Sequence, residues 1–256
     1  MELAPSVNLE LYQKYAPNTL DLPSATAYDR AFVKLRLGLL SKFAPGKSVL
    51  DLCCGTGSYS LPILGTVKSL TGVDFCDHML GEFKNRTPKK YLSKLSLIEA
   101  DARRLPLEDG TFDFIFSFCS LYHVPDIAEV YREIFRVSRP GAIVVLEIGN
   151  QISLNTLVTS IQHRRLGWAK QTAKPFYKMD RIAREAGFSI LQKEYAQLLP
   201  MYGAPPELVP LYPLFSPAWK RVMGLNVRGR MLDQWVSGLW PLRHFAFRQI
   251  VVMKKQ

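Results

Sequence analysis

The sequence predicts an α/β fold, in which helices cover both faces of a mostly parallel sheet. Apolar runs of strand length alternate with helical or loop segments, a pattern typical of βαβ units. The run Phe112–Phe118 is almost entirely apolar, as expected for a strand buried on both faces. The expected strands are residues 48–53, 69–75, 95–100, 112–118 and 142–148, separated by helical or loop segments at 58–65, 77–86 and 126–137.

We interpret residues 1–256 as one domain in which this alternating core carries additions on both sides. The segment 197–244 is far longer than an ordinary hairpin loop and is rich in aromatic residues and proline, which favours a helical lid over a site. The expected parts are an N-terminal helical cap at 1–45 with helices at 8–16 and 24–43, a cofactor-binding core at 46–148, a helix at 178–186, a strand at 188–196, the lid insert at 197–244 and a last strand at 245–254.

Composition is that of an ordinary globular protein, with 48% hydrophobic and 21% charged residues, and argues against disorder. No run approaches the roughly 20 apolar residues that span a bilayer. The start, Met1–Pro5, lacks the basic segment and apolar run of a signal peptide, so we expect a cytoplasmic protein. The four cysteines form no C-x-x-C pair and have no histidine cluster near them, so we expect no metal site.

The net charge of +11 is unevenly distributed along the chain. Residues 1–150 contain 17 Lys and Arg against 17 Asp and Glu, whereas residues 151–256 contain 16 against 5. The whole excess therefore belongs to the C-terminal part. Two interpretations stay open: a solvated basic surface, or contact with an anionic acceptor, a membrane surface or nucleic acid.

The strongest local motif runs from Val49 to Gly57, where an apolar strand enters a turn that contains Gly55 and Gly57. Glycine lets the backbone approach a ligand closely, and the start of a following helix favours a negative group. This motif alone is weak, because dinucleotide-binding enzymes also have a strand, a glycine turn and a helix. Their third glycine would fall at Ser60, which argues against a nicotinamide cofactor.

Two carboxylates strengthen the argument through their positions relative to the strands. Asp74 ends the second expected strand, where it can accept hydrogen bonds from both ribose hydroxyls, and Asp101 ends the third, where it can accept one from an adenine amine. Each acid alone is more often a helix cap or a surface residue. Together with the glycine turn, they predict a site for a nucleoside without a pyrophosphate.

These motifs are similar to those of class I S-adenosylmethionine-dependent methyltransferases, particularly the ubiquinone/menaquinone-biosynthesis-like (methyltransferase type 11) group of small-molecule enzymes. The resemblance covers roughly residues 45–190 in order and is specific for fold and cofactor, but not for the acceptor. The matching segments are Asp51-x-Cys53-x-Gly55-x-Gly57, Gly72–Phe75 with His78–Leu80, Asp101-Ala102 with Leu105-Pro106, Phe112-Asp113, Ser120–Val124, Arg139–Gly141 and Ala186–Phe188.

The resemblance implies a Rossmann-like seven-stranded sheet of order 3-2-1-4-5-7-6, with an antiparallel last strand and S-adenosyl-L-methionine at the carboxyl ends of the strands. It also implies the residues that bind this cofactor. These are Asp51, Cys53, Gly55, Gly57, Ser117 and Phe118 for the methionine part, Asp74 for the ribose, Phe75, Met79, Asp101 and Ala102 for the adenine, and Tyr15 and Tyr28 as residues that close over the cofactor. Cys53 departs from the family pattern, which has glycine there, but we expect binding to survive because Gly55 and Gly57 remain.

Methyl transfer depends mainly on holding the acceptor in line and excluding water, and a base helps when the acceptor carries a proton. His123 is the candidate base and Tyr122 its orienting neighbour, although His123 can equally be a structural loop histidine.

The aromatic insert predicts a small apolar or aromatic acceptor, methylated at oxygen or carbon, such as a natural product, a quinone or a lipid-like molecule. Arg228, Arg230 and Arg243 are candidates for meeting an anionic group or a lipid surface. Ser117–Tyr122 lacks the proline of base-modifying methyltransferases, which argues against nucleic acid. A cofactor-binding protein without transferase activity, or a partner subunit, stays an alternative; the oligomeric state is left open.

Overall fold

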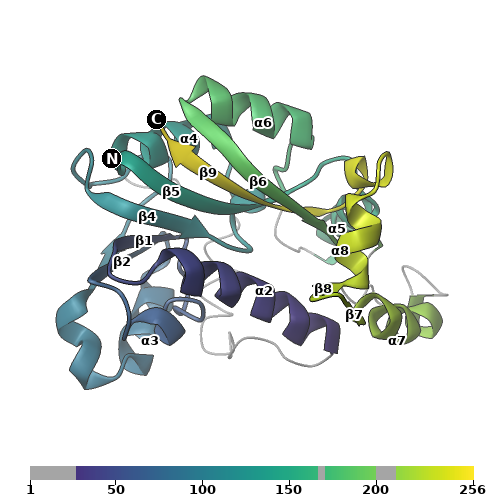
Figure 1. Ribbon diagram of the computed structural model, residues 1–256, viewed down its shortest axis with the longest axis horizontal. Coiled ribbons are helices and arrows are strands. Elements are labelled where there is room, and N and C mark those ends of the chain that lie inside the picture. Colours follow the sequence, from purple (N-terminus) through teal and green to yellow (C-terminus); the bar gives the residue numbers. More distant parts are fainter. Residues whose placement is uncertain (1–26, 167–170, 200–211) are drawn as a thin grey trace.

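The computed structural model describes residues 27–166, 171–199 and 212–256, and its centre is one seven-stranded sheet in the order β3-β2-β1-β4-β5-β9-β6 (Figure 1). Strands β7 and β8 pair only with each other, so β9 is the seventh strand of the main sheet. It runs antiparallel to both β5 and β6, which confirms the predicted order and the antiparallel last strand. The strands are β1 Ser48–Leu52, β2 Ser69–Asp74, β3 Leu95–Glu99, β4 Phe112–Ser117, β5 Ser138–Gly149, β6 Phe188–Ala196, β7 Asn226–Val227, β8 Arg230–Met231 and β9 Arg248–Lys255.

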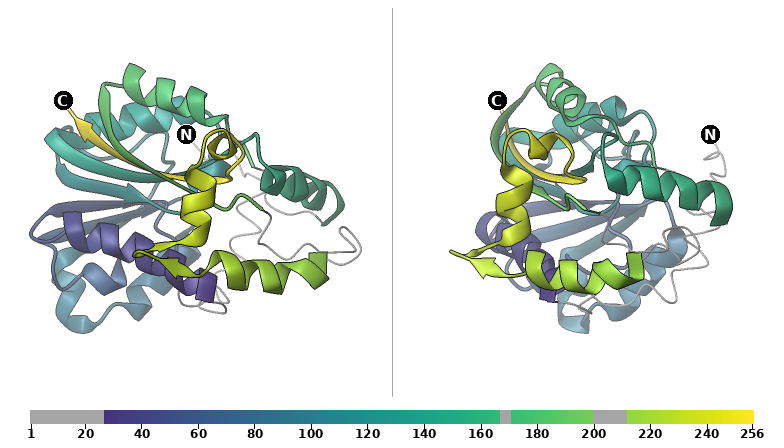
Figure 2. Two further views of the ribbon diagram at one scale, coloured as in Figure 1. Left: turned by 45° about the vertical axis from the view of Figure 1, so that its right-hand side comes forward. Right: turned by 90° about the vertical axis from the view of Figure 1, so that its right-hand side faces the viewer.

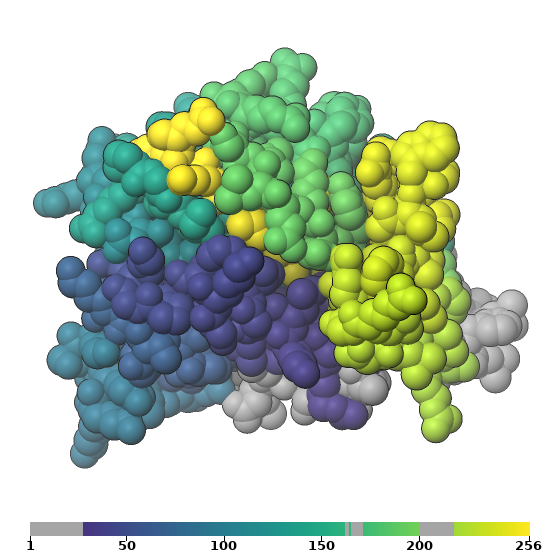
Figure 3. Space-filling model, viewed as in Figure 1, coloured from purple at the N-terminus to yellow at the C-terminus, as the bar shows by residue number. Residues whose placement is uncertain are grey.

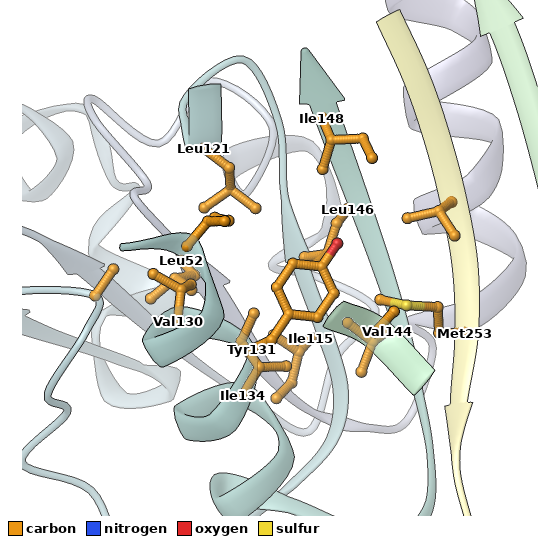
Figure 4. Close-up of a cluster of buried hydrophobic side chains, with 14 of the residues drawn as sticks. Leu52, Ile115, Leu121, Val130, Tyr131, Ile134, Val144, Leu146, Ile148 and Met253 are labelled. Carbon is orange, nitrogen blue, oxygen red and sulfur yellow. The ribbon is translucent and has the colours of Figure 1, made fainter. Parts of the chain in front are cut away.

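Helices cover both faces of the sheet because successive strand side chains point to opposite sides. Ile115 belongs to the apolar core under α4 (Ile127–Val137) and α6 (Phe176–Glu185), close to Leu146 and Tyr131 (Figure 4). The flanking Phe114 and Phe116 belong to the core under α2 (Ala27–Phe43) and α3 (Asp77–Arg86). The result is a helix–sheet–helix sandwich whose strand ends are free to build a site.

Some elements differ from the expectations. Between Gly57 and Gly65 the chain forms only a short 3₁₀-helical turn, Leu61–Ile63, because Pro62 has no N–H to extend a helix and can be accommodated only in a first turn. A helix that the sequence did not predict, α5 (Leu154–Leu166), follows β5. The expected helix 8–16, with Tyr15, lies outside the described residues. In the described parts of the chain, no helix is long and apolar enough to cross a membrane.

The segment between β6 and β9 adds α7 (Tyr212–Met223), the β7–β8 hairpin and α8 (Leu232–Gly238) beside one end of the sheet (Figure 2). Asp233 of α8 is fully buried, and its carboxylate accepts hydrogen bonds from the Tyr28 hydroxyl at 2.9 Å and from the Gln197 N–H at 2.6 Å. In the space-filling view, the insert lies against α2 (Figure 3); α7 packs on α2, and α8 packs on β6. The insert is therefore packed onto both the N-terminal helix and the sheet.

Three buried ionic groups join elements that are far apart in the sequence. The fully buried Glu147 of β5 forms ion pairs with Arg36 of α2, at 2.7 Å, and with Arg248 at the start of β9. Arg36 also donates to the Tyr59 hydroxyl at 2.6 Å, and Arg248 donates to the Gln197 side chain at 2.7 Å. We call Arg36, Glu147 and Arg248 the ionic triad. It connects the N-terminal helix, the centre of the sheet and the last strand.

Replacing Glu147 with Gln should destabilise the protein strongly, because two guanidinium groups would stay buried without their carboxylate. Removing one partner of a buried ion pair lowers the free energy of unfolding by about 3–5 kcal/mol. The measurement is the free energy of unfolding in urea.

The matched control is Glu185→Gln, which removes an exposed carboxylate paired with Arg181 within α6. Exposed pairs of this kind contribute little to stability, because water and salt screen them. Equal losses in the two variants would contradict a stabilising role for the ionic triad.

Candidate active site

The carboxyl ends of β1, β2, β3 and β4 are tied together by hydrogen bonds at one edge of the sheet. The Cys54 N–H donates to the Val73 carbonyl at 2.9 Å, and the Ala100 N–H donates to the Asp74 carbonyl at 3.0 Å. The Ser120 hydroxyl donates to the Cys53 carbonyl at 3.3 Å, which fixes the loop after β4 against the turn after β1. The segments that carry the predicted site residues therefore meet at one place.

The turn after β1 needs residues that tolerate left-handed backbone. Cys53, Gly55 and Gly57 have φ angles of 59°, 52° and 75°. A Cβ atom on Gly57 would lie 2.2 Å from the Phe83 ring, whereas one on Gly55 would meet no atom within 4 Å. Gly57 is thus required by packing, while the position of Gly55 leaves open space beside the backbone. Cys53 adopts the same backbone region in spite of its side chain.

Asp74 anchors this turn from the end of β2. Its carboxylate accepts hydrogen bonds from the Gly55 N–H at 2.8 Å and from the Cys76 N–H at 3.1 Å. Burial raises the pKa of Asp74 to about 6, and the backbone hydrogen bonds limit that rise. A carboxylate oxygen has lone pairs left after one such bond, so the group can also accept from a ligand hydroxyl.

Asp51 provides a second buried carboxylate beneath the turn. It accepts a hydrogen bond from the Ser60 hydroxyl at 2.7 Å and is 4% exposed. Burial raises the pKa of Asp51 to about 7; the Ser60 hydrogen bond opposes this rise, and the charge of Asp74 adds to it. Two acids whose pKa values are raised by burial therefore lie under the same bend.

Asp101 is the third acid at this edge, and unlike Asp51 and Asp74 it is paired with an arginine and has a lowered pKa. The Arg103 side chain donates to both of its oxygens, at 2.5–3.0 Å. Burial raises the pKa of Asp101, but the hydrogen bonds and charge of Arg103 outweigh burial and leave that pKa below its ordinary value. The pKa of the Cys53 thiol is raised by burial first, and then by the charges of Asp74, Asp51 and Asp101. All three predicted carboxylates thus act on the residue at the start of the bend.

The end of β4 offers a further polar group. The Ser117 hydroxyl is buried and has no hydrogen-bond partner among the described residues, an arrangement that is costly unless a ligand or water supplies one. The neighbouring Phe118 is 5% exposed and packs edge-on against Tyr59, with ring centroids 5.1 Å apart. Three acids and an orphaned hydroxyl fit a polar ligand that carries positive charge, as S-adenosylmethionine does through its sulfonium and ammonium groups.

The remaining predicted cofactor residues have varied surroundings. Phe75 is half-buried directly after Asp74, whereas Met79, in the first turn of α3, and Ala102 are buried. Tyr28 is bonded to Asp233 of the insert, so its hydroxyl is engaged by α8. Tyr15 lies outside the described residues.

Tyr122 and His123 lie in a short 3₁₀-helical turn, Leu121–His123, in the loop after β4. Their rings are 4.6 Å apart, and the His123 N–H donates to the Ser120 carbonyl at 2.9 Å. The Tyr122 ring also packs at 5.4 Å from Phe247. The loop that holds the candidate base is therefore fixed on one side to the bend after β1 and on the other to the start of β9.

Sequence reasoning missed the ionic triad and Tyr59, which border Phe118. The guanidinium of Arg36 lies 6.0 Å from the Phe118 ring centroid, and that of Arg248 lies 5.5 Å from the Tyr122 ring. A signal was present, because Glu147 interrupts an otherwise apolar strand and buried carboxylates need a partner. Its partners lie 111 and 101 residues away, so their pairing required the fold.

Comparison with protein families places this geometry in context. Residues 50–146 match the family model described as a methyltransferase domain. A demethylmenaquinone methyltransferase from Bacillus mycoides is 36% identical over 104 residues, which are 40% of this chain and 44% of the relative. This match thus spans less than half of the length of that curated relative. The residues matched by the family model include the strands that carry the bend and the acids.

Two solved structures share the architecture over most of the chain. The cyclase SpnF covers 100% of this chain with 17% identity and a TM-score of 0.66, and 98% of its own chain is matched. An S-adenosylmethionine-dependent methyltransferase from Mesorhizobium loti covers 90% with 17% identity and a TM-score of 0.60, and 99% of that chain is matched. At this identity the likeness establishes the fold alone. By the family match, residues 50–146 are a methyltransferase domain; they are similar to the ubiquinone/menaquinone-biosynthesis-like group, and the implied cofactor is S-adenosylmethionine.

Proposed function

We propose that this protein transfers a methyl group from S-adenosylmethionine to a small apolar or aromatic acceptor, at oxygen or carbon. The observation that carries the proposal is the convergence of Asp51, Asp74 and Asp101 on the bend that starts at Cys53. The direct test mixes the protein with methyl-labelled S-adenosylmethionine and a panel of phenols, quinols and fatty acids. Labelled product from one class supports the proposal, and binding of the cofactor with no product from any class counts against it.

The bound cofactor supplies a methyl group that its sulfonium charge has already activated. The chain's own part is to bind, orient and exclude water. When the cofactor is bound, Asp74 would accept hydrogen bonds from the ribose and Asp101 from the adenine, and Phe75 and Met79 would flank the adenine. The Asp51–Gly57 bend and the Ser117-Phe118 segment hold the methionine part. His123 accepts a proton from the acceptor, and Tyr122 orients the His123 ring.

An aromatic or apolar acceptor is supported by the rings near the ionic triad. Phe32 lies 4.2 Å from the Arg36 guanidinium and 5.8 Å from that of Arg248, measured to the ring centroid. Aromatic rings favour a flat molecule that can stack on them, and the guanidinium groups, which pair with Glu147, hold these rings in place. This chemistry suits a phenol, a quinol or an enol, and it makes nucleic acid the weaker candidate.

The insert between β6 and β9 is the lid of this proposed site. Its α8 is fixed to Tyr28 and Gln197 through Asp233, so α2, β6 and the insert are held as one packed unit. A lid that is built into the fold in this way shapes the acceptor space and keeps water out.

A cofactor-binding protein without methyl transfer is a second candidate. The structural neighbour SpnF is named as a cyclase, and its likeness to this chain extends over the whole length. A shared fold is compatible with different chemistry at the same site. Calorimetric binding of S-adenosylhomocysteine without any labelled product in the assay above would favour this candidate.

Affinity for S-adenosylmethionine should rise with pH between about pH 6 and pH 7 and level off above that window. Asp74 and Asp51 have pKa values raised by burial to about 6 and about 7, so both are partly protonated there before the cofactor binds. A nearby positive charge favours the ionised carboxylate, so binding expels protons and is weaker where more protons are bound. Isothermal titration calorimetry across this pH range measures the effect.

Two controls test the cause of this pH dependence. S-adenosylhomocysteine lacks the sulfonium charge and should show a shallower dependence. Asp51→Asn keeps an acceptor for the Ser60 hydroxyl but removes the titrating group, so its profile should flatten. A variant whose profile matches that of the wild type would rule out Asp51 as the origin.

Replacing His123 with Gln should lower turnover by about 10²–10⁴-fold, the usual contribution of a general base, and change cofactor affinity little. A base also leaves an ascending limb in the pH profile of turnover, and that limb should disappear in the variant. Comparable turnover in the two proteins would remove His123 from the mechanism and leave it as a structural loop residue.

A further inference from the structure

Large apolar side chains gather at the surface beside the start of α5 and in the segment that follows α8. Ile152 and Leu154 lie at the start of α5, and Leu239, Trp240 and Phe245 follow α8. Their exposed fractions run from 47% to 74%, and Trp240 is the most exposed. Single exposed apolar residues are ordinary, but a group of this size marks an interaction surface.

The two segments are fixed side by side by one buried residue. The Asn150 side-chain amide donates to the Ile152 carbonyl at 3.0 Å, the His244 carbonyl at 2.8 Å and the Ala246 carbonyl at 2.9 Å. The two segments that carry these apolar side chains are therefore neighbours in the fold. We call this group the apolar rim, and its members are Ile152, Leu154, Leu239, Trp240 and Phe245.

The rim lies at the edge of the sheet where the candidate active site is built. Asn150 directly follows β5, and β1, β2 and β4, which run parallel to β5, end at the same edge. Viewed toward this end of the molecule, α5 lies on one side and α7 with α8 on the other (Figure 2, right). A molecule that reaches the site along this edge would pass the rim.

The two segments beside this edge, residues 150–166 and 212–247, carry almost only positive charge. Within the described segments 150–166 and 212–247 the one carboxylate is that of Asp233, which is buried and bonded to Tyr28, Gln197 and Ser237. The same segments carry Arg164, Lys220, Arg221, Arg228, Arg230 and Arg243. Arg230 pairs with Glu194 and Lys220 lies 4.0 Å from Asp29, so the others supply most of the excess.

We propose that this end of the protein docks on a membrane surface that contains anionic lipids. The apolar rim enters the headgroup region, where tryptophan is favoured because its ring is apolar and its N–H is polar. The arginines of the same two segments pair with lipid phosphates, and each basic residue near such a surface adds to binding. The proposal deepens the proposed function by giving its apolar acceptor a source, a molecule dissolved in the bilayer.

The experiment is co-sedimentation of the full chain with vesicles of phosphatidylcholine alone and with vesicles that also contain phosphatidylglycerol. Two double variants test the surface: Leu239→Ser with Trp240→Ser for the rim, and Arg221→Glu with Arg228→Glu for the charge. Each should weaken partition to the anionic vesicles by about tenfold or more, and added salt should weaken that of the wild type.

Matched controls place equal changes elsewhere on the surface. Leu191→Ser removes an apolar side chain of β6 that is 56% exposed, and Lys84→Glu with Lys89→Glu reverses two exposed charges at the far end of the sheet. These controls should partition as the wild type does. Equal partition of all the variants, or wild-type partition that is no better with anionic than with neutral vesicles, would overturn the proposal.

Two further readouts separate this proposal from others. A dimer seen by sedimentation velocity without vesicles, and dissociated by Trp240→Ser, would make a second copy of the chain the occupant of the rim and would overturn membrane docking. Cofactor titration of the same variants distinguishes the two proposals: weaker vesicle binding with unchanged affinity for S-adenosylmethionine supports docking as a separate property. Anionic-vesicle binding by a wild type that yields no methylated product would contradict the proposed function and leave docking supported.

Discussion

The hydrogen bond from the Gly55 N–H to the Asp74 carboxylate holds the candidate site together. It joins the bend after β1 to the end of β2, and it places a buried acid where the backbone is left-handed and open. The pKa values of Asp51 and Asp74 rise because this arrangement excludes water before any ligand is bound. Ionising these two carboxylates is costly when the site is empty. A positively charged ligand lowers that cost, so the site favours such a ligand.

The ionic triad has a complementary role on the other side of the site. Glu147 lies in the middle of the sheet, and its two arginines come from the N-terminal helix and the last strand. Because breaking a buried ion pair leaves an uncompensated charge, the positions of α2 and β9 relative to β5 are tightly specified. The aromatic rings that contact Arg36 and Arg248 are therefore held in fixed positions. The insert packs against the same part of the fold through Asp233.

Sequence patterns predicted the features that depend on local periodicity. The strands, the bend and the acids at strand ends follow from apolar runs punctuated by glycine and aspartate, and the fold has them close to the expected residues. The order of the strands was implied by the family resemblance, and the sheet has that order. Helix α5 was missed because Leu154–Leu166 has little amphipathic pattern. The pairing of Glu147 with Arg36 and Arg248, and of Asp233 with Tyr28, was missed because partners so distant in sequence leave no local signal.

The position of β9 has a consequence for how the chain matures during translation. β9 lies between β5 and β6, yet the ribosome completes both of these strands and the whole insert before it reaches Arg248. Until then the facing edges of β5 and β6 have no partner strand and Glu147 lacks one of its two arginines, a state that favours aggregation with other chains. The half built from β1 to β4, which carries the bend and the three acids, needs neither β9 nor the insert, so it can assemble early and act as the template onto which the rest of the sheet folds last.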